Sequence, residues 1–161
     1  LSLHDALPIC KGRERIMEEP PKDPEEPILN RQSWLQISVY GMVLATFVSG
    51  AYLYGHYVWE LPFEQCNNIA FFSLAFAQLL HVLDMRDPDE PIFNNQVTRN
   101  KYVWMAIVFC IIVLMTAYFI PGLSDLLSFQ TMEARTWVLI AIAALAPIFT
   151  IQLLKSLTKK I

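Results

Sequence analysis

The sequence has few charged residues and few cysteines, and it lacks the compact motifs of a soluble catalytic site. Charged side chains make up 17% of the 161 residues and the formal net charge is −3, which is too small to indicate nucleic acid binding. The three cysteines, Cys10, Cys66 and Cys110, match no zinc, haem or thioredoxin-type spacing. A phosphate-binding glycine loop, a nucleophile elbow, a HExxH pair and a CxxC pair are all missing. We therefore expect neither catalytic residues nor a bound cofactor in this chain.

The sequence does contain long hydrophobic segments. Hydrophobic residues make up 55% of the chain, and they fall mainly into four blocks that short polar stretches separate. A helix needs about 20 largely apolar residues to cross a hydrocarbon layer of about 30 Å. We therefore predict an all-α integral membrane four-helix bundle, with transmembrane helices at 34–57, 68–83, 102–120 and 136–154.

The positive charges predict how such a bundle is oriented. Of the 12 Lys and Arg residues, only Arg135 lies in the connections 58–67 and 121–135. Segments rich in Lys and Arg stay in the cytoplasm. The pattern therefore predicts that both termini are cytoplasmic, with three cytoplasmic segments: a proline-rich linker at 10–33, a loop at 84–101 and a tail at 155–161.

Residues 1–9 (LSLHDALPI) are left out of the fold prediction. They lack the basic start and the long apolar core of a signal peptide. They also resemble a translated sequencing-adapter scar. We expect them to be non-native, which would make the chain a fragment of a longer protein.

The second apolar block contains the polar residues of most interest. Gln78 and His81 lie three residues apart and share a helix face, and Asp84 follows about one turn later. A polar side chain at membrane depth costs free energy unless it finds a partner. The face either lines an ion route, with the Gln78 amide oxygen as a ligand, or fastens the bundle through hydrogen bonds. Spacing alone favours the second interpretation, and it favours packing over metal binding for His81.

Two further features concern helix packing. Gly41, Ala45 and Ser49 repeat every four residues, which predicts that another helix approaches this stripe closely. Pro147 lies inside the fourth block, where it removes one backbone hydrogen bond and predicts a kink. Thr150 and Gln152 follow it and are candidates to satisfy the freed groups.

Four segments are informative when they are taken in order: RERIMEEPPKDPEEPIL, LAFAQLLHVLDMRDP, NKYVWMAIVFCIIVLMTAYFIPGLSDLLSF and LAPIFTIQLLKSL. They resemble the C-terminal membrane region of cation-transporting P-type ATPases, the group that contains the calcium pumps. The first is similar to the linker after that family's sixth membrane helix, and the others are similar to its eighth, ninth and tenth helices. The resemblance covers roughly residues 13–158.

The resemblance implies that the chain supplies helices seven to ten of a ten-helix pump in a bacterial plasma membrane. In that family ATP, with Mg, phosphorylates the aspartate of a DKTG motif, and helices four to six hold most of the ion. None of these parts is in this sequence, so the resemblance implies that the chain supports the rest of the pump. Gln78 aligns with a glutamate ligand of the two-site calcium pumps. An amide there suits a one-site calcium pump, while sodium, potassium and proton transport stay open.

Two other functions remain as alternatives. A stand-alone four-helix membrane protein would act as an assembly partner. A small secondary transporter would work through Gln78 and His81. Inverted repeats would favour the transporter, and the two halves of the sequence show none.

Overall fold

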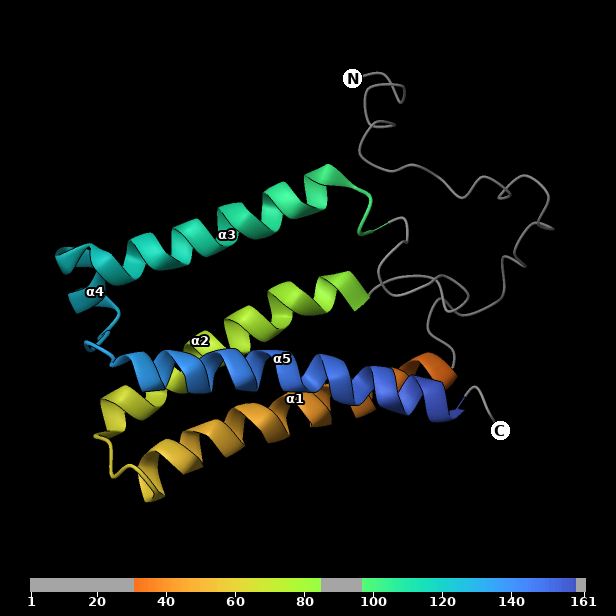
Figure 1. Ribbon diagram of the computed structural model, residues 1–161, viewed down its shortest axis with the longest axis horizontal. Coiled ribbons are helices and arrows are strands. Elements are labelled where there is room, and N and C mark those ends of the chain that lie inside the picture. The colour runs from red at the N-terminus through yellow and green to blue at the C-terminus, as the bar shows by residue number, and fades with distance from the viewer. Residues whose placement is uncertain (1–30, 85–96, 159–161) are drawn as a thin grey trace. The chain divides into compact units, whose positions relative to one another are not determined.

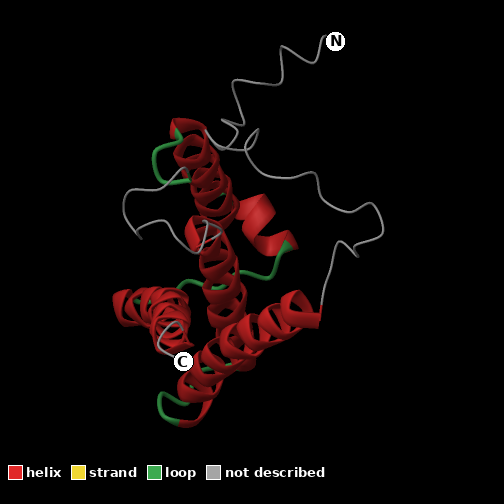
Figure 2. Ribbon diagram, turned by 90° about the vertical axis from the view of Figure 1, so that its right-hand side faces the viewer, coloured by secondary structure: helices red, strands yellow, loops and turns green. Residues whose placement is uncertain are grey.

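The computed structural model describes residues 31–84 and 97–158. These residues form helices and loops without a strand (Figures 1 and 2), which confirms the predicted all-α class. The elements in chain order are α1 (Arg31–Tyr57), α2 (Phe63–His81), the 3₁₀ turn η2 (Val82–Asp84), α3 (Lys101–Phe119), α4 (Pro121–Leu126) and α5 (Ala134–Thr158). The expectations for residues 1–9, for most of the linker at 10–33 and for the centre of the loop at 84–101 lie outside the described residues.

The chain divides into two compact units, residues 1–37 and residues 38–161. Of the first unit the structure describes only residues 31–37, which form the start of α1. The second unit holds the rest of α1 and all the later helices. Every tertiary contact discussed below lies within this second unit.

Three of the described helices are long and apolar enough to cross a membrane: Trp34–Tyr57, Lys101–Phe119 and Ala134–Leu154. Helix α2 is not among them. Its first turns carry Glu64, Gln65, Asn67 and Asn68, which lower the mean hydropathy of a helix that is only 19 residues long. The fourth crossing, expected at 68–83, therefore stays a prediction.

The connection between α3 and α5 contains a helix that the sequence pattern did not predict. Pro121 and Gly122 end the third apolar block, and α3 does end at Phe119. Pro121 then opens α4, because a proline in the first turn needs no hydrogen-bond partner. The Phe129 N–H donates to the Ser124 carbonyl at 2.8 Å and the Ser128 N–H to the Asp125 carbonyl at 3.1 Å. With Ser128 at a φ of 55°, these bonds form a Schellman cap on α4.

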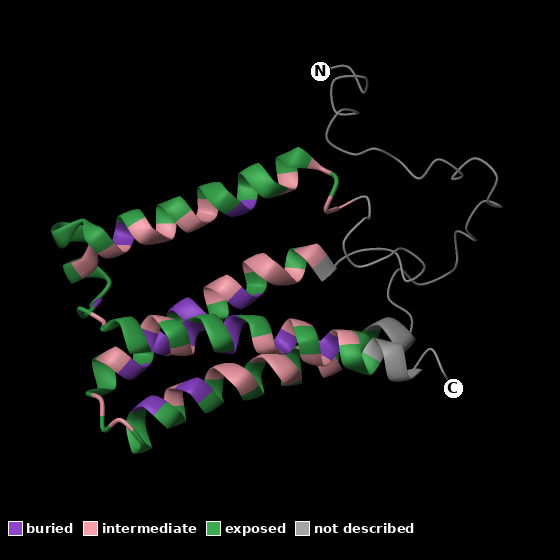
Figure 3. Cartoon of the chain, in the orientation of Figure 1, coloured by how far each residue is buried: buried purple, intermediate pink, exposed green. Residues whose placement is uncertain are grey.

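The main packing interface joins α2 to α5. The two helices lie side by side and contribute most of the buried positions (Figure 3). Several of these residues are small, including Ala77 on α2 and Ala143 and Ala144 on α5. Small side chains let two helix backbones approach closely, which is the usual way helices associate in lipid.

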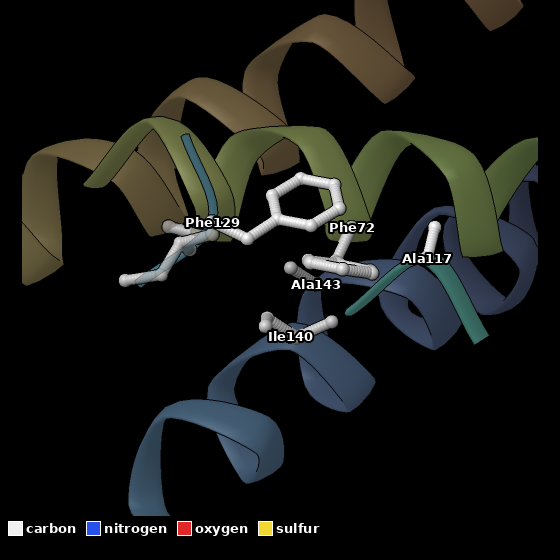
Figure 4. Close-up of a cluster of buried hydrophobic side chains, with 7 residues drawn as sticks. Phe72, Ala117, Phe129, Ile140 and Ala143 are labelled. Carbon is white, nitrogen blue, oxygen red and sulfur yellow. The ribbon is translucent and has the colours of Figure 1, made fainter. Parts of the chain in front are cut away.

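An aromatic cluster fills one end of this interface. Phe72 on α2 is fully buried, and its ring centroid lies 5.0 Å from that of Phe129 and 5.3 Å from that of Trp137. Figure 4 shows Phe72 and Phe129 beside Ala143 and Ile140 of α5. The Tyr118 ring of α3 joins the cluster at 5.8 Å from Phe72. The cluster thus connects α2, α3, α5 and the loop after α4.

Candidate functional site

The structure places Gln78 on an open side of α2. Its side chain is exposed and lines a groove of about 420 Å³ between α2 and α3. The other lining residues are Ala75 and Leu79 of α2, and Phe109, Cys110, Val113 and Leu114 of α3. Gln78 therefore contributes the one amide among the described residues that line this groove, and the other lining side chains are apolar apart from the thiol of Cys110.

The Gln78 amide has a carbonyl oxygen that can accept two hydrogen bonds and an NH₂ group that can donate two. Among the described residues, none forms a hydrogen bond with it. The described residues that line the groove between α2 and α3 carry no carboxyl or basic group. In a membrane such an amide needs a partner, and the described helices do not supply it.

His81 lies one turn further along α2 and meets a different neighbour. Its ring centroid is 5.6 Å from that of Tyr40 on α1, in an edge-to-face arrangement. The Nδ1 atom of His81 is buried and has no hydrogen-bond partner in the described part of the chain. The structure thus directs Gln78 to the α3 groove and His81 to α1, so it does not join them into one polar surface. Asp84 ends the 3₁₀ turn that follows α2.

Residues 31–84 and 97–158 contain no group of three or more His, Cys, Asp or Glu side chains that could hold a metal ion. Gln78 alone offers too few oxygen atoms for a calcium ion, which takes six to eight. Any cation held by Gln78 would therefore need additional ligands, and the other described residues that line the groove have no side-chain oxygen to offer.

The small-residue stripe of α1 is exposed. Gly41, Ala45 and Ser49 all lie at the surface of the described part of the chain, and a Cβ added at Gly41 would meet nothing within 4 Å. Gly55 differs, because a Cβ there would lie 2.9 Å from Cδ1 of Ile69 on α2. The close approach within the described helices therefore occurs at Gly55, and the stripe itself stays uncovered by them.

Helix α5 continues from Ala134 to Thr158 with Pro147 inside it. A proline leaves the carbonyl four residues earlier, here that of Ala143, without its usual donor. The Thr150 hydroxyl donates to the Ala146 carbonyl at 2.9 Å. Thr150 therefore does not satisfy the group that Pro147 frees.

Two buried polar residues of α2 were given no role by the sequence. Asn68 is 4% exposed, and with its amide oxygen turned toward the loop it accepts from the Gln130 N–H at 2.7 Å and donates to the Glu64 carbonyl at 3.2 Å. Ser73 is fully buried and its hydroxyl has no partner among the described residues. Each is a polar residue inside an apolar block, which is the same signal that marked Gln78.

The two connections on the Arg135 side of the bundle also meet. The Arg135 guanidinium lies 2.7 Å from a Glu133 carboxylate oxygen, and its Cζ lies 5.1 Å from the centre of the Trp59 ring. Because the Arg135 and Glu133 side chains are both largely exposed, their ion pair contributes little stability. The contact with Trp59 does bring the α1–α2 connection next to the start of α5.

Two proteins that are named as calcium-transporting ATPases are similar to this chain. A protein named calcium-transporting ATPase from Bacillus subtilis (strain 168) is 24% identical over 136 residues, which is 83% of this chain and 15% of that protein. A calcium-transporting ATPase 1 from Bacillus cereus (strain ATCC 10987 / NRS 248) is 24% identical over 94 residues, 58% of this chain and 10% of its own length. The chain therefore spans only a small part of these relatives.

The family comparison covers nearly the whole sequence. Residues 3–157 match the family described as "Cation transporting ATPase, C-terminus". The match includes all the membrane-length helices, the α2–α5 interface and Gln78. The chain therefore belongs to the family that forms the C-terminal membrane region of cation-transporting ATPases.

Proposed function

We propose that the chain is the C-terminal membrane domain of an ATP-driven calcium pump and that Gln78 supplies one neutral ligand to the transported ion. The family match supports the pump, and the names of the two Bacillus relatives support calcium. The observation that carries the role of Gln78 is its exposed amide, which has no hydrogen-bond partner among the described residues.

In this proposal the work is divided between two parts of one protein. The part outside this chain binds ATP and Mg, forms the phosphorylated aspartate and supplies most of the ion ligands. The interface between α2 and α5 gives the moving helices a packed support. The chain itself sits in the lipid of a bacterial plasma membrane, with both termini in the cytoplasm.

The chemistry of the Gln78 site is consistent with a hard cation. Calcium binds carboxylate, carbonyl and amide oxygens, and a neutral amide lowers the total negative charge of the site. The charge that balances the ion then comes from carboxylates elsewhere in the pump, because the described residues that line the groove between α2 and α3 carry none. A site with one amide in place of a carboxylate suits fewer bound ions.

The test uses the complete pump with substitutions at position 78. Gln78→Ala removes the oxygen, so the calcium concentration for half-maximal ATPase activity should rise roughly tenfold, the equivalent of about 1.4 kcal/mol. Gln78→Glu adds a charged ligand and should lower that calcium concentration. Leu74→Ala, one turn earlier on the same exposed side of α2, is the matched control and should leave it unchanged.

Two results would contradict the proposal. An unaltered calcium dependence in both Gln78 variants would remove this residue from the ion site. An ATPase activity that responds to another cation and not to calcium would show that the transported ion is not calcium. The sequence of the gene upstream of residue 10 gives an independent check, because the proposal requires it to encode the DKTG aspartate.

A further inference from the structure

The chain between α3 and α5 carries an exposed apolar surface, which we name the leucine face. Its members are Phe119, Ile120, Leu123, Leu126 and Leu127. Leu126 is 78% exposed and Phe119 is 72% exposed. Moving such apolar side chains out of water would lower the free energy, because apolar surface is more stable in an apolar environment.

The leucine face is one side of an amphipathic helix. Leu123, Leu126 and Leu127 have the spacing i, i+3, i+4, which places them together on α4. Asp125 lies on the opposite side of the helix at 100° per residue and is exposed. Ser124 is half-buried, and its hydroxyl donates to the Phe129 carbonyl at 3.3 Å.

Helix α4 is fixed at both ends, so the leucine face is held outward. At its start the Ser124 N–H donates to the Ile120 carbonyl at 2.8 Å. At its end the Schellman cap leads directly to Phe129, which is buried in the aromatic cluster. The Met132 N–H then donates to the Tyr118 hydroxyl at 2.9 Å, which closes the loop onto α3. The leucines cannot turn inward without breaking these contacts.

The surroundings indicate what covers the leucine face. It continues an exposed side of α3 that carries large apolar residues, including Met105 and Ile112. Helix–helix contacts in membranes favour small residues, whereas bulky apolar side chains suit lipid. Helix α3 is also among the most apolar spans, and only 11% of it is buried. The leucine face is therefore continuous with an exposed side of α3 whose bulky apolar side chains suit lipid.

We infer that α4 lies in the membrane interface at the end of α3, with its leucine face among the lipid acyl chains and Asp125 in the water. Interfacial amphipathic helices bind lipid in this way, with the apolar face buried about 5–10 Å at the boundary of the headgroups. The aromatic cluster beneath α4 then ties this lipid contact to α2 and α5. The inference depends on the membrane location and not on the identity of the transported ion.

The test places a nitroxide on either side of α4 in the complete protein. Leu126→Cys and Asp125→Cys are introduced into a variant whose other cysteines have been replaced and which retains ATPase activity. The labelled proteins are then reconstituted in phosphatidylcholine vesicles. The Leu126 label should collide with oxygen at least threefold more than with a water-soluble nickel chelate. The Asp125 label should show the reverse preference.

Two results would overturn the inference. A Leu126 label that is as open to the nickel chelate as the Asp125 label would place the leucine face in water. A Leu126 label that neither reagent reaches would mean that protein covers the face, either another part of the pump or a second copy. Because the Leu126 and Asp125 side chains are both exposed, neither label should disturb packing. Leu127→Cys provides a second position on the same face.

Discussion

At the scale of single residues, Asn68 fastens α2 to the loop that precedes α5. Its amide bonds both the Gln130 N–H and the Glu64 carbonyl, and its side chain is almost fully buried. Asn68→Ala leaves the Gln130 N–H without a partner, so we expect a loss of about 1–3 kcal/mol in the free energy of unfolding. Thermal inactivation of the solubilised pump measures this change.

Asn67 provides the control for that measurement. It is the same residue type at the next position of α2, and its side chain is exposed. Asn67→Ala should leave the inactivation temperature nearly unchanged. Equal effects from the two substitutions would show that the Asn68 hydrogen bonds to Gln130 and Glu64 do not stabilise the protein.

The sequence identified Gln78 but not the direction in which it points. A glutamine in an apolar block is unusual, and the family resemblance gave it a candidate role. The interpretation that Gln78 and His81 share one face was incomplete, because two residues three apart on a helix can still meet different neighbours. Tyr40 of α1 takes the His81 ring, while Phe109 and Cys110 of α3 border Gln78. Those neighbours are set by tertiary packing, which residue spacing does not encode.

At the scale of elements, the exposed stripe of α1 makes a specific prediction. If a helix outside the described residues packs on Gly41, Ala45 and Ser49, then Ala45→Leu overpacks that contact and should cost about 1–3 kcal/mol. The temperature at which the solubilised pump loses half its activity should fall accordingly. The stripe has no cover within the described helices, so the substitution leaves the α2–α5 interface intact.

Gly50→Leu is the comparison for Ala45→Leu. Gly50 lies on another side of α1, and a Cβ there would meet nothing within 4 Å. This substitution also introduces a leucine in place of a small residue, but away from the stripe. A tolerated Ala45→Leu, or an equal loss from Gly50→Leu, would rule out specific packing on the stripe.

The long helices were easier to predict from the sequence than the short one. Long apolar runs specify α1, α3 and α5, because each run is close to the length of a membrane crossing. Helix α4 has only six residues and depends on its cap and on Phe129, which is a tertiary contact. Pro121 and Gly122 ended one helix as expected, but the same proline is also a favourable first residue for the next.

At the scale of the whole molecule, the distribution of charge predicts which connections face outward. Cells expressing the complete pump with Glu133→Cys should react with a membrane-impermeant maleimide, since this residue is exposed beside Arg135. Arg99→Cys, just before α3, should react only after the membrane is opened. The measurement is the extent of labelling in intact and in permeabilised cells. Labelling of the Arg99 variant in intact cells would reverse the topology.

Helix α2 depends on a partner that is synthesised after it. It is not among the helices that are apolar enough to cross a membrane, and its main contact is with α5, which follows it in the chain. A ribosome must therefore release α2 into the membrane before α5 exists to cover it. A chain that stops at Thr131 should be degraded several-fold faster than the complete protein, which a pulse-chase experiment measures, whereas equal lifetimes would contradict this dependence. During biogenesis, the synthesis of α5 must therefore outpace the quality-control proteases that recognise an uncovered α2.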